Sequence, residues 1–207
     1  MNTPPAGPVP RVPREEVRRR LLEAAWQVFA TKGYANARLD EIAYAAGFTK
    51  GAVYSNFSSK HALLAHLIQE RVREYSAEQV RSIRSQRRPV HVLEDAAAAF
   101  AHAVVHQQVW TRLLVEIGQQ AAQDEEVQAL YVNVRRQLRQ DLTDVLSRAF
   151  AALGLRSVVT PEQLSLTLQS LTLGLTVEHG TDPQEVDEQT VTAVFTAVLR
   201  SLVHRPE

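Results

Sequence analysis

Apolar residues recur every three or four positions along most of the chain, which is the spacing of one face of an α-helix. The first such stripe lies between Pro13, which suits the first turn of a helix, and Gly33, which suits its end. Its members are Val17, Leu21, Ala25, Val28 and Phe29. The pattern therefore predicts a first helix over residues 13–33.

Two short helical patterns follow, and a glycine separates them. The first contains Leu39, Ile42, Ala43 and Ala46 and ends at Gly47. The second begins after Thr49, whose hydroxyl is expected to cap it, and its buried side carries Val53 and Phe57. A small residue, a glycine turn and an apolar anchor at this spacing predict a helix-turn-helix, whose second helix enters the DNA major groove.

The exposed side of that second helix carries groups suited to nucleic acid. Lys50 can bind a phosphate or guanine, Tyr54 a phosphate oxygen, and Asn56 a base edge. Lys60 opens the next helix, where its charge and the free backbone N–H groups both favour a phosphate. The predicted DNA-contacting residues are Arg38, Thr49, Lys50, Gly51, Tyr54, Ser55, Asn56 and Lys60.

These residues carry a family resemblance. F-A-T-K-G-Y at 29–34 and I-A-Y-A-A-G-F-T-K-G-A-V-Y-S-N-F-S-S-K at 42–60 resemble the N-terminal domain of TetR-family bacterial repressors, over roughly residues 14–68. The resemblance implies a dimer, a small-molecule pocket among the middle helices and repression relieved by an effector. Ala37 and Arg38 stand where the family usually has a Thr or Ser pair, so either Asn36 caps this helix or Arg38 itself reaches a phosphate.

Further helical patterns fill the rest of the chain. A long one runs from Ser59 to Gln86, before Pro89, and three more cover residues 92–108, 109–122 and 125–153. Leu164 to Val177 alternates Leu and Thr like a strand, but the capping box Thr160-Pro-Glu-Gln163 favours a helix. As a helix it has two apolar stripes, and a dimer partner could cover the second. The predicted final helix opens at the box Asp182-Pro-Gln-Glu185.

We expect the last two helices to form a four-helix interface with their copies. In a monomer the same residues would be ordinary core positions. The predicted interface residues are Leu164, Leu168, Leu171, Leu175, Val191, Phe195, Val198 and Leu202.

Composition adds a division of charge. Residues 1–91 hold 15 Lys or Arg against 8 Asp or Glu, a charge of +7, and residues 92–207 carry −7. A basic first part points one end of the protein at a polyanion. We predict an all-α fold with a disordered arm (1–12), a three-helix helix-turn-helix domain (13–60) and a helical effector-binding and dimerisation domain (61–207). No apolar run spans a membrane, no signal peptide is visible and cysteine is absent, so we expect a cytoplasmic protein.

Signatures of enzymes are missing from the sequence, which contains no G-x-S-x-G, H-E-x-x-H, G-x-G-x-x-G or G-x-x-x-x-G-K motif. We therefore expect no catalysis, cofactor or metal. Asp95, His102 and His106 share one helical face, either as metal ligands or as surface polar groups. Phe100, Trp110 and Tyr131 either line a pocket for an apolar effector or fill the core. The prediction is a repressor that binds a palindromic operator as a dimer; an activator or a ligand-independent regulator is the alternative.

Overall fold

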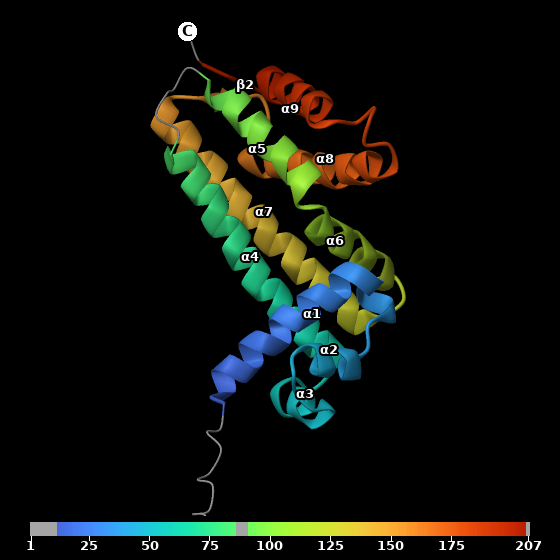
Figure 1. Cartoon of the computed structure of the whole chain (residues 1–207). Helices are drawn as coiled ribbons and strands as arrows, with labels where there is room; N and C mark the ends of the chain where they lie inside the picture. The colour runs from blue at the N-terminus through green and yellow to red at the C-terminus, as the bar shows by residue number, and fades with distance from the viewer. Residues whose placement is uncertain (1–11, 86–90, 206–207) are drawn as a thin grey trace, which may run out of the picture. The chain divides into compact units, whose positions relative to one another are not determined.

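The computed structural model describes residues 12–85 and 91–205, and the chain divides into two compact units after Leu67. Almost all of the predicted arm, and the predicted helix break at Pro89, lie outside the described residues. The described residues form helices, which Figure 1 shows, and one antiparallel pair of two-residue strands, so the predicted all-α fold is confirmed with a small addition. Within the described ranges, no helix is both long enough and apolar enough to cross a membrane.

The first unit contains α1, α2, α3 and the start of α4, and the second contains the remaining elements. The bounds are α1 Arg14–Asn36, α2 Leu39–Ala45, α3 Lys50–Asn56, α4 Lys60–Ser85, α5 Val92–His106, α6 Gln108–Gln120, α7 Glu125–Leu153, β1 Arg156–Ser157, α8 Pro161–Thr181, α9 Glu188–Leu202 and β2 Val203–His204. β1 pairs antiparallel with β2. Gly33 has φ 75°, so regular helical backbone is interrupted there as predicted, although one more short turn follows it.

The core of the first unit is formed by the stripes predicted from the sequence. Leu21 and Ala25 of α1, Ile42 of α2 and Val53 of α3 have no exposed surface. Phe57, directly after α3, is also buried, and the guanidinium of Arg18 lies 5.1 Å from the centre of its ring. α1 and α2 therefore support α3 from one side and leave its other side open.

The turn between α2 and α3 depends on the backbone of one glycine. Gly47 has φ 75°, its N–H donates to the carbonyl of Tyr44 at 3.0 Å, and the N–H of Phe48 donates to that of Ala43 at 2.9 Å. This pair of bonds is a Schellman motif, which satisfies the carbonyls at the end of a helix. A Cβ on Gly47 would meet no atom within 4 Å, so the positive φ, and not space, favours glycine.

The starts of α2 and α3 differ from the prediction. Thr49 is the N-cap residue of α3, but its hydroxyl makes no capping hydrogen bond, so the predicted hydroxyl cap is wrong. At α2 the N-cap is Arg38, whose backbone N–H donates to the Glu41 carboxylate at 3.4 Å. Asn36 does not cap this helix, because its Nδ2 donates back to the carbonyl of Lys32 at 3.3 Å.

Lys60 joins the start of α4 to the end of α1. Its Nζ donates to the carbonyls of Tyr34 at 2.9 Å, Ala35 at 3.1 Å and Ala37 at 3.1 Å, and it lies 4.6 Å from the centre of the Tyr34 ring. Three carbonyls match the three donors of an ammonium group. Lys60 therefore satisfies the end of one helix and holds the loop that leads into α2.

The second unit is built around α5, α8 and α9, which Figure 1 shows side by side. The rings of Phe100 on α5 and Phe195 on α9 stack with centres 5.0 Å apart. Leu164 and Leu168 of α8 and Val191 of α9 fill the space around them and have no exposed surface. This contact between helices far apart in sequence forms the centre of the unit.

Those positions correct the predicted dimer interface. Leu164, Leu168, Val191 and Phe195 lie inside their own subunit, and a side chain without exposed surface cannot pack against a second chain. Leu171, Leu175 and Leu202 pack partly against the same core, and Val198 is half-buried. In the other stripe of α8, Leu166 is 44% and Val177 is 50% exposed, whereas Leu173 is half-buried.

Capping explains where α8 and α9 begin. Thr160 and Gln163 form the predicted reciprocal capping box at the start of α8. The box predicted at Asp182 does not start the last helix: Asp182 accepts from the N–H groups of Gln184 and Glu185 in a turn. α9 begins at Glu188 instead, and Asp187 caps it by accepting from Thr190 N at 2.8 Å.

Lys60→Met tests the role of the ammonium group. The variant keeps the aliphatic chain but leaves three carbonyls without their donor, and hydrogen bonds to charged groups are worth about 1.5–3 kcal/mol each. Because Lys60 is half-buried and water can replace part of these bonds, we expect the first unit to lose on the order of 2 kcal/mol of stability in urea unfolding, less than the sum of three such bonds. Lys50→Met is the control, because Lys50 is exposed and its loss should change stability by less than about 0.5 kcal/mol. Equal stability of the two variants would contradict this role.

Candidate DNA-binding surface and ligand cavity

One side of α3 is exposed and carries most of the predicted DNA-contacting residues. Thr49, Lys50, Gly51 and Ser55 are exposed, and half of the surface of Tyr54 is. The Nζ of Lys50 lies 5.9 Å from the centre of the Tyr54 ring, one helical turn away. A cation, a phenol hydroxyl and a glycine without Cβ thus occupy the outer face of a helix whose inner face is anchored at Val53.

Two predicted contacts have a different geometry from the one expected. Asn56 is half-buried, and its Nδ2 donates to the carbonyl of Ala52 at 2.8 Å, so its amide turns back onto α3. Lys60 directs its ammonium at the three carbonyls described above. Neither side chain presents a free donor outward, because the backbone of the same unit already uses these donors. Direct contact of Asn56 and Lys60 with DNA stays a prediction, since it would require these donors to leave their partners within the unit.

The guanidinium of Arg38 is placed where it can still contact a DNA phosphate. It holds the Asp40 carboxylate through Nε at 3.1 Å and Nη2 at 2.9 Å, and this bond keeps the pKa of Asp40 below its ordinary value. The Arg38 side chain is 71% exposed. Exposed ion pairs contribute little stability, so a phosphate can replace Asp40 as the partner at little cost.

Sequence reasoning missed Tyr44. This residue of α2 is 87% exposed, which makes it the most exposed of the large hydrophobic residues in the described parts of the chain. The signal was present, because Tyr44 falls outside the apolar stripe of the predicted helix. Arg14 of α1 also reaches this surface: its Nη2 donates to the carbonyl of Ser55 at 3.3 Å, near the end of α3.

The second unit contains a cavity of about 130 Å³ between α5, α6, α7 and α8. Apolar and polar side chains line it in equal number, and the polar ones include four charged residues, Arg135, Asp141, Asp144 and Arg148. The lining includes Phe100, Trp110, Leu138, Leu173, Arg135 and Gln169. An engineered protein cavity of similar size, 150 Å³, binds benzene, so a single ring fits this volume.

Two polar groups distinguish this cavity from ordinary core. Gln169 lines it, and the Oε1 of that side chain is buried without a hydrogen-bond partner. Arg135 also lines it, and burial is the main cause that lowers the pKa of its guanidinium. Unsatisfied buried acceptors are uncommon in folded proteins, and each calls for an explanation such as a ligand or a water.

The aromatic residues predicted for a pocket separate into two groups. Phe100 and Trp110 line the cavity. Tyr131 does not: its ring packs against α6, where a Cβ placed on Gly118 would lie 3.1 Å from the Tyr131 hydroxyl. The glycine and the tyrosine therefore bring α6 and α7 close together, a structural role that the sequence pattern did not reveal.

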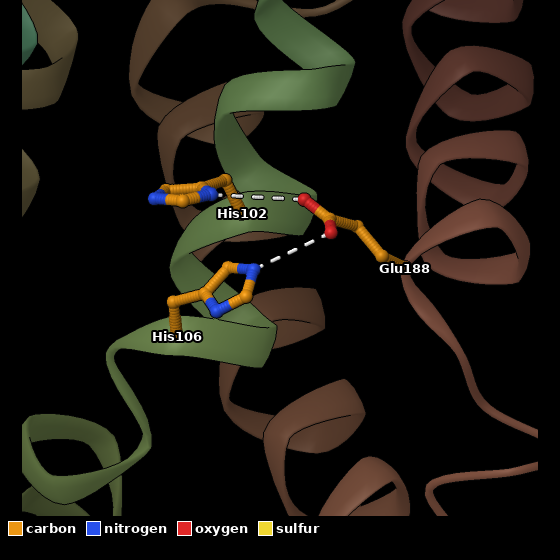
Figure 2. Close-up of side chains that lie close together, drawn as sticks. All are labelled: His102, His106 and Glu188. Carbon is orange, nitrogen blue, oxygen red and sulfur yellow. Dashed lines mark hydrogen bonds and ion pairs between the residues drawn. The ribbon is translucent and has the colours of Figure 1, made fainter.

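In the structure the residue that lies beside His102 and His106 is Glu188, and not Asp95 as the sequence suggested. His102 and His106 of α5 lie beside Glu188, the first residue of α9 (Figure 2). Asp95, the third residue of the predicted trio, is exposed and is not part of this group. Seven residues along a helix is about 10 Å, too far for one coordination sphere.

Comparison with known proteins finds relatives among bacterial transcription factors. The chain is 36% identical over 106 residues to the HTH-type transcriptional activator FasR of Mycolicibacterium smegmatis, a match that covers 51% of this chain and 48% of the activator. The matched region thus spans about half of that relative's length. An HTH-type transcriptional repressor of Mycobacterium tuberculosis is 27% identical over 171 residues, which covers 82% of this chain and 86% of the repressor.

Solved structures share the fold at low sequence identity. A putative transcriptional regulator from Saccharomonospora viridis, in complex with choline, superposes with a TM-score of 0.73 at 18% identity over 92% of this chain and all of that chain. A putative regulator from Rhodococcus sp. RHA1 reaches 0.75 at 17% identity, over 89% of this chain and 95% of the other.

Two family models together cover most of the chain. The model described as bacterial regulatory proteins of the tetR family matches residues 21–67, which contain α2, α3 and their supports. The model described as BetI-type transcriptional repressor, C-terminal, matches residues 89–204, more than half of the chain. The helix-turn-helix geometry, the shared fold and these two matches agree: the chain belongs to the TetR family of bacterial transcriptional regulators.

Proposed function

We propose that the protein is a ligand-responsive repressor that binds a palindromic operator as a homodimer and is released by a small-molecule effector. The observation that carries the proposal is the pairing, in one chain, of an open α3 face with a cavity lined by Gln169, whose buried Oε1 has no hydrogen-bond partner. The name of the Mycobacterium tuberculosis relative supports repression. The name of the FasR relative supports activation as the alternative.

DNA recognition would use α3 in the major groove. Lys50 and Tyr54 project from the exposed face, Gly51 permits close approach, and Arg38 and Tyr44 flank it on α2 and its N-cap. Two copies would read half-sites about one turn of DNA, ~34–36 Å, apart. Lys60 and Asn56 would support DNA binding indirectly, because their hydrogen bonds hold α3 and the loop before α2 in place.

Dimer formation would use the outward stripe of α8 together with α9. Leu166, Ser170, Gly174 and Val177 share one exposed face of α8, and no atom lies within 4 Å of a Cβ built on Gly174. Ala193 and Ala197 are exposed one turn apart on α9. Small and apolar residues let two helix pairs approach closely, and a stable interface needs about 1,000 Å² or more of buried surface. The occupant of this face is a second copy of the chain.

The effector would occupy the cavity in the second unit. Choline, stearoyl-CoA and triclosan are bound by proteins with this fold, so the fold accommodates very different ligands. Here the volume of about 130 Å³ suits a single apolar ring, and Gln169 Oε1 suits a hydrogen-bond donor on it. Larger ligands, for which pockets of about 300–1,000 Å³ are usual, would have to spread the surrounding helices.

Release from DNA would follow from differential binding. An effector that prefers one arrangement of the second unit shifts the population toward it, and α4 continues from the first unit into the second. Such coupling is typically about 1–3 kcal/mol, or roughly 5–150-fold in affinity. The effector-bound dimer would hold its two recognition helices at the wrong spacing.

Salt dependence and one lysine test DNA binding. The probe is a duplex that covers the region upstream of the protein's own gene, titrated at several salt concentrations. Lys50→Ala should weaken binding and lower the slope of log affinity against log salt by about 1, because one phosphate contact is lost. Arg136→Ala is the matched control, since it removes the same charge from the exposed side of α7. If both variants changed the affinity for DNA and its salt dependence equally, the proposal that α3 contacts the DNA would be refuted.

Val177→Asp tests the dimer. A carboxylate at this exposed position leaves the subunit folded but would be desolvated without a partner in the interface. We expect sedimentation to show monomers for Val177→Asp and dimers for Val158→Asp, a control in which a valine that is 63% exposed outside the two helices receives the same charge. A dimer that survives Val177→Asp would exclude this face.

Benzene and phenol together test the cavity. Phenol adds one hydrogen-bond donor to the same ring. If this donor bonds to Gln169, phenol should bind about 2–10-fold more tightly than benzene, which corresponds to the free energy of one neutral hydrogen bond. Gln169→Leu should remove that preference and, by deleting a buried unsatisfied acceptor, raise stability by about 1 kcal/mol. Calorimetric titration measures the preference and urea unfolding measures the stability. A preference for phenol that persists in Gln169→Leu would contradict the assignment.

A further inference from the structure

A second site lies on the surface of the second unit, where the C-terminal end of α5 meets the N-terminal end of α9. His102 and His106 stand one turn apart on α5, and Glu188 reaches toward both from α9 (Figure 2). His102 Nδ1 is 3.7 Å from Glu188 Oε1, and His106 Nε2 is 3.4 Å from Glu188 Oε2. The two imidazole ring centres are 4.4 Å apart.

These distances fit a shared cation. Zinc binds imidazole nitrogen and carboxylate oxygen at about 2.0–2.2 Å, so two ligand atoms of one tetrahedral ion lie about 3.4 Å apart. One ligand atom from each of the three residues lies within 4.8 Å of the other two. Small side-chain rotations would close the remaining gap, and all three side chains have room to rotate because they are 47–62% exposed.

The helices that carry the three ligands are fixed relative to each other. Phe100 and Phe195 stack between α5 and α9, and Arg200 Nε of α9 donates to Glu94 of α5 at 3.2 Å. The site is therefore anchored on two packed elements, and its ligands need not be gathered from flexible loops.

Electrostatics also favours a cation here. His106 is the last residue of α5, where free carbonyl groups give the helix end a partial negative charge. Residues 92–207 together carry −7, which attracts cations to this part of the chain.

We propose that His102, His106 and Glu188 bind a divalent transition-metal ion, with zinc the closest match. Two nitrogen ligands and one oxygen ligand suit zinc and its neighbours in the first transition series, whereas magnesium and calcium prefer oxygen alone. Three protein ligands leave at least one coordination position for water. This assignment replaces the expectation that the chain binds no metal, and it is independent of the proposed effector cavity.

Metal bound here would tie α9 to α5. α5 lines the effector cavity through Phe100 and Ala103, and α9 carries part of the proposed dimer face. Binding to the folded state alone stabilises it by mass action, so the metal strengthens the link between these two helices.

The test uses full-length protein without a histidine tag, freed of metal by a chelator. Calorimetric titration with zinc should show one ion per chain. At 100 times the dissociation constant, zinc should raise the melting temperature by about 5 °C or more, whereas magnesium and calcium should not. Cobalt substitution should give the visible absorption of a site with nitrogen and oxygen ligands.

Three single variants and one control locate the site. His102→Ala, His106→Ala and Glu188→Gln should each weaken zinc binding at least 10-fold and abolish the thermal shift, while circular dichroism shows the fold intact. His204→Ala removes an exposed imidazole elsewhere in the same unit and should bind zinc like the unchanged protein. Absence of zinc binding, or unchanged affinity in His106→Ala and Glu188→Gln, would overturn the proposal.

Discussion

The ammonium group of Lys60 and the three carbonyls that surround it are central to the proposed recognition surface. α1 ends with carbonyls that have no partner within the helix, and burying such groups unpaired costs stability. Lys60 supplies donors to Tyr34, Ala35 and Ala37 at once and so fixes the chain where it turns from α1 toward α2. The Schellman motif at Gly47 fixes the next turn in the same way. α3 can present Lys50 and Tyr54 outward because the backbone on either side of it is held by these bonds.

The second unit obeys a different constraint, the packing of three helices around one aromatic pair. With Phe100 and Phe195 stacked, the apolar stripe that contains Leu164 and Leu168 faces inward, and Leu166 and Val177 remain on the exposed side of α8. α5 also lines the cavity and carries the histidine pair. The central helix thus brings together the proposed effector site, the proposed metal site and the core.

The cavity and the proposed metal site contain polar groups in two different environments, one buried and the other exposed. Gln169 Oε1 is buried without a partner, a state that a ligand can relieve. His102, His106 and Glu188 are exposed, and Glu188 lies 3.7 Å from His102 and 3.4 Å from His106. The first site is therefore expected to select by hydrogen bonding within the cavity, and the second by the preference of a cation for nitrogen and oxygen ligands.

Local sequence determined most helices, because helical periodicity, capping residues and glycines act over a few neighbouring positions. These local signals predicted the span 125–153 of α7, the capping box at Thr160 and the helix-turn-helix around Gly47. The outer face of α3 followed from the same pattern, since burying Val53 leaves Lys50 and Tyr54 on the other side.

Only the tertiary structure decided which partners the side chains find. Lys60 meets residues about 25 positions earlier, Glu188 meets His106 from 82 positions away, and one of two similar leucine stripes on α8 becomes core. No local pattern distinguishes these outcomes, because a helix offers the same donors and the same apolar surface whichever neighbour it meets. The choice depends on which neighbouring element covers each face, and that is settled by the packing of the whole unit.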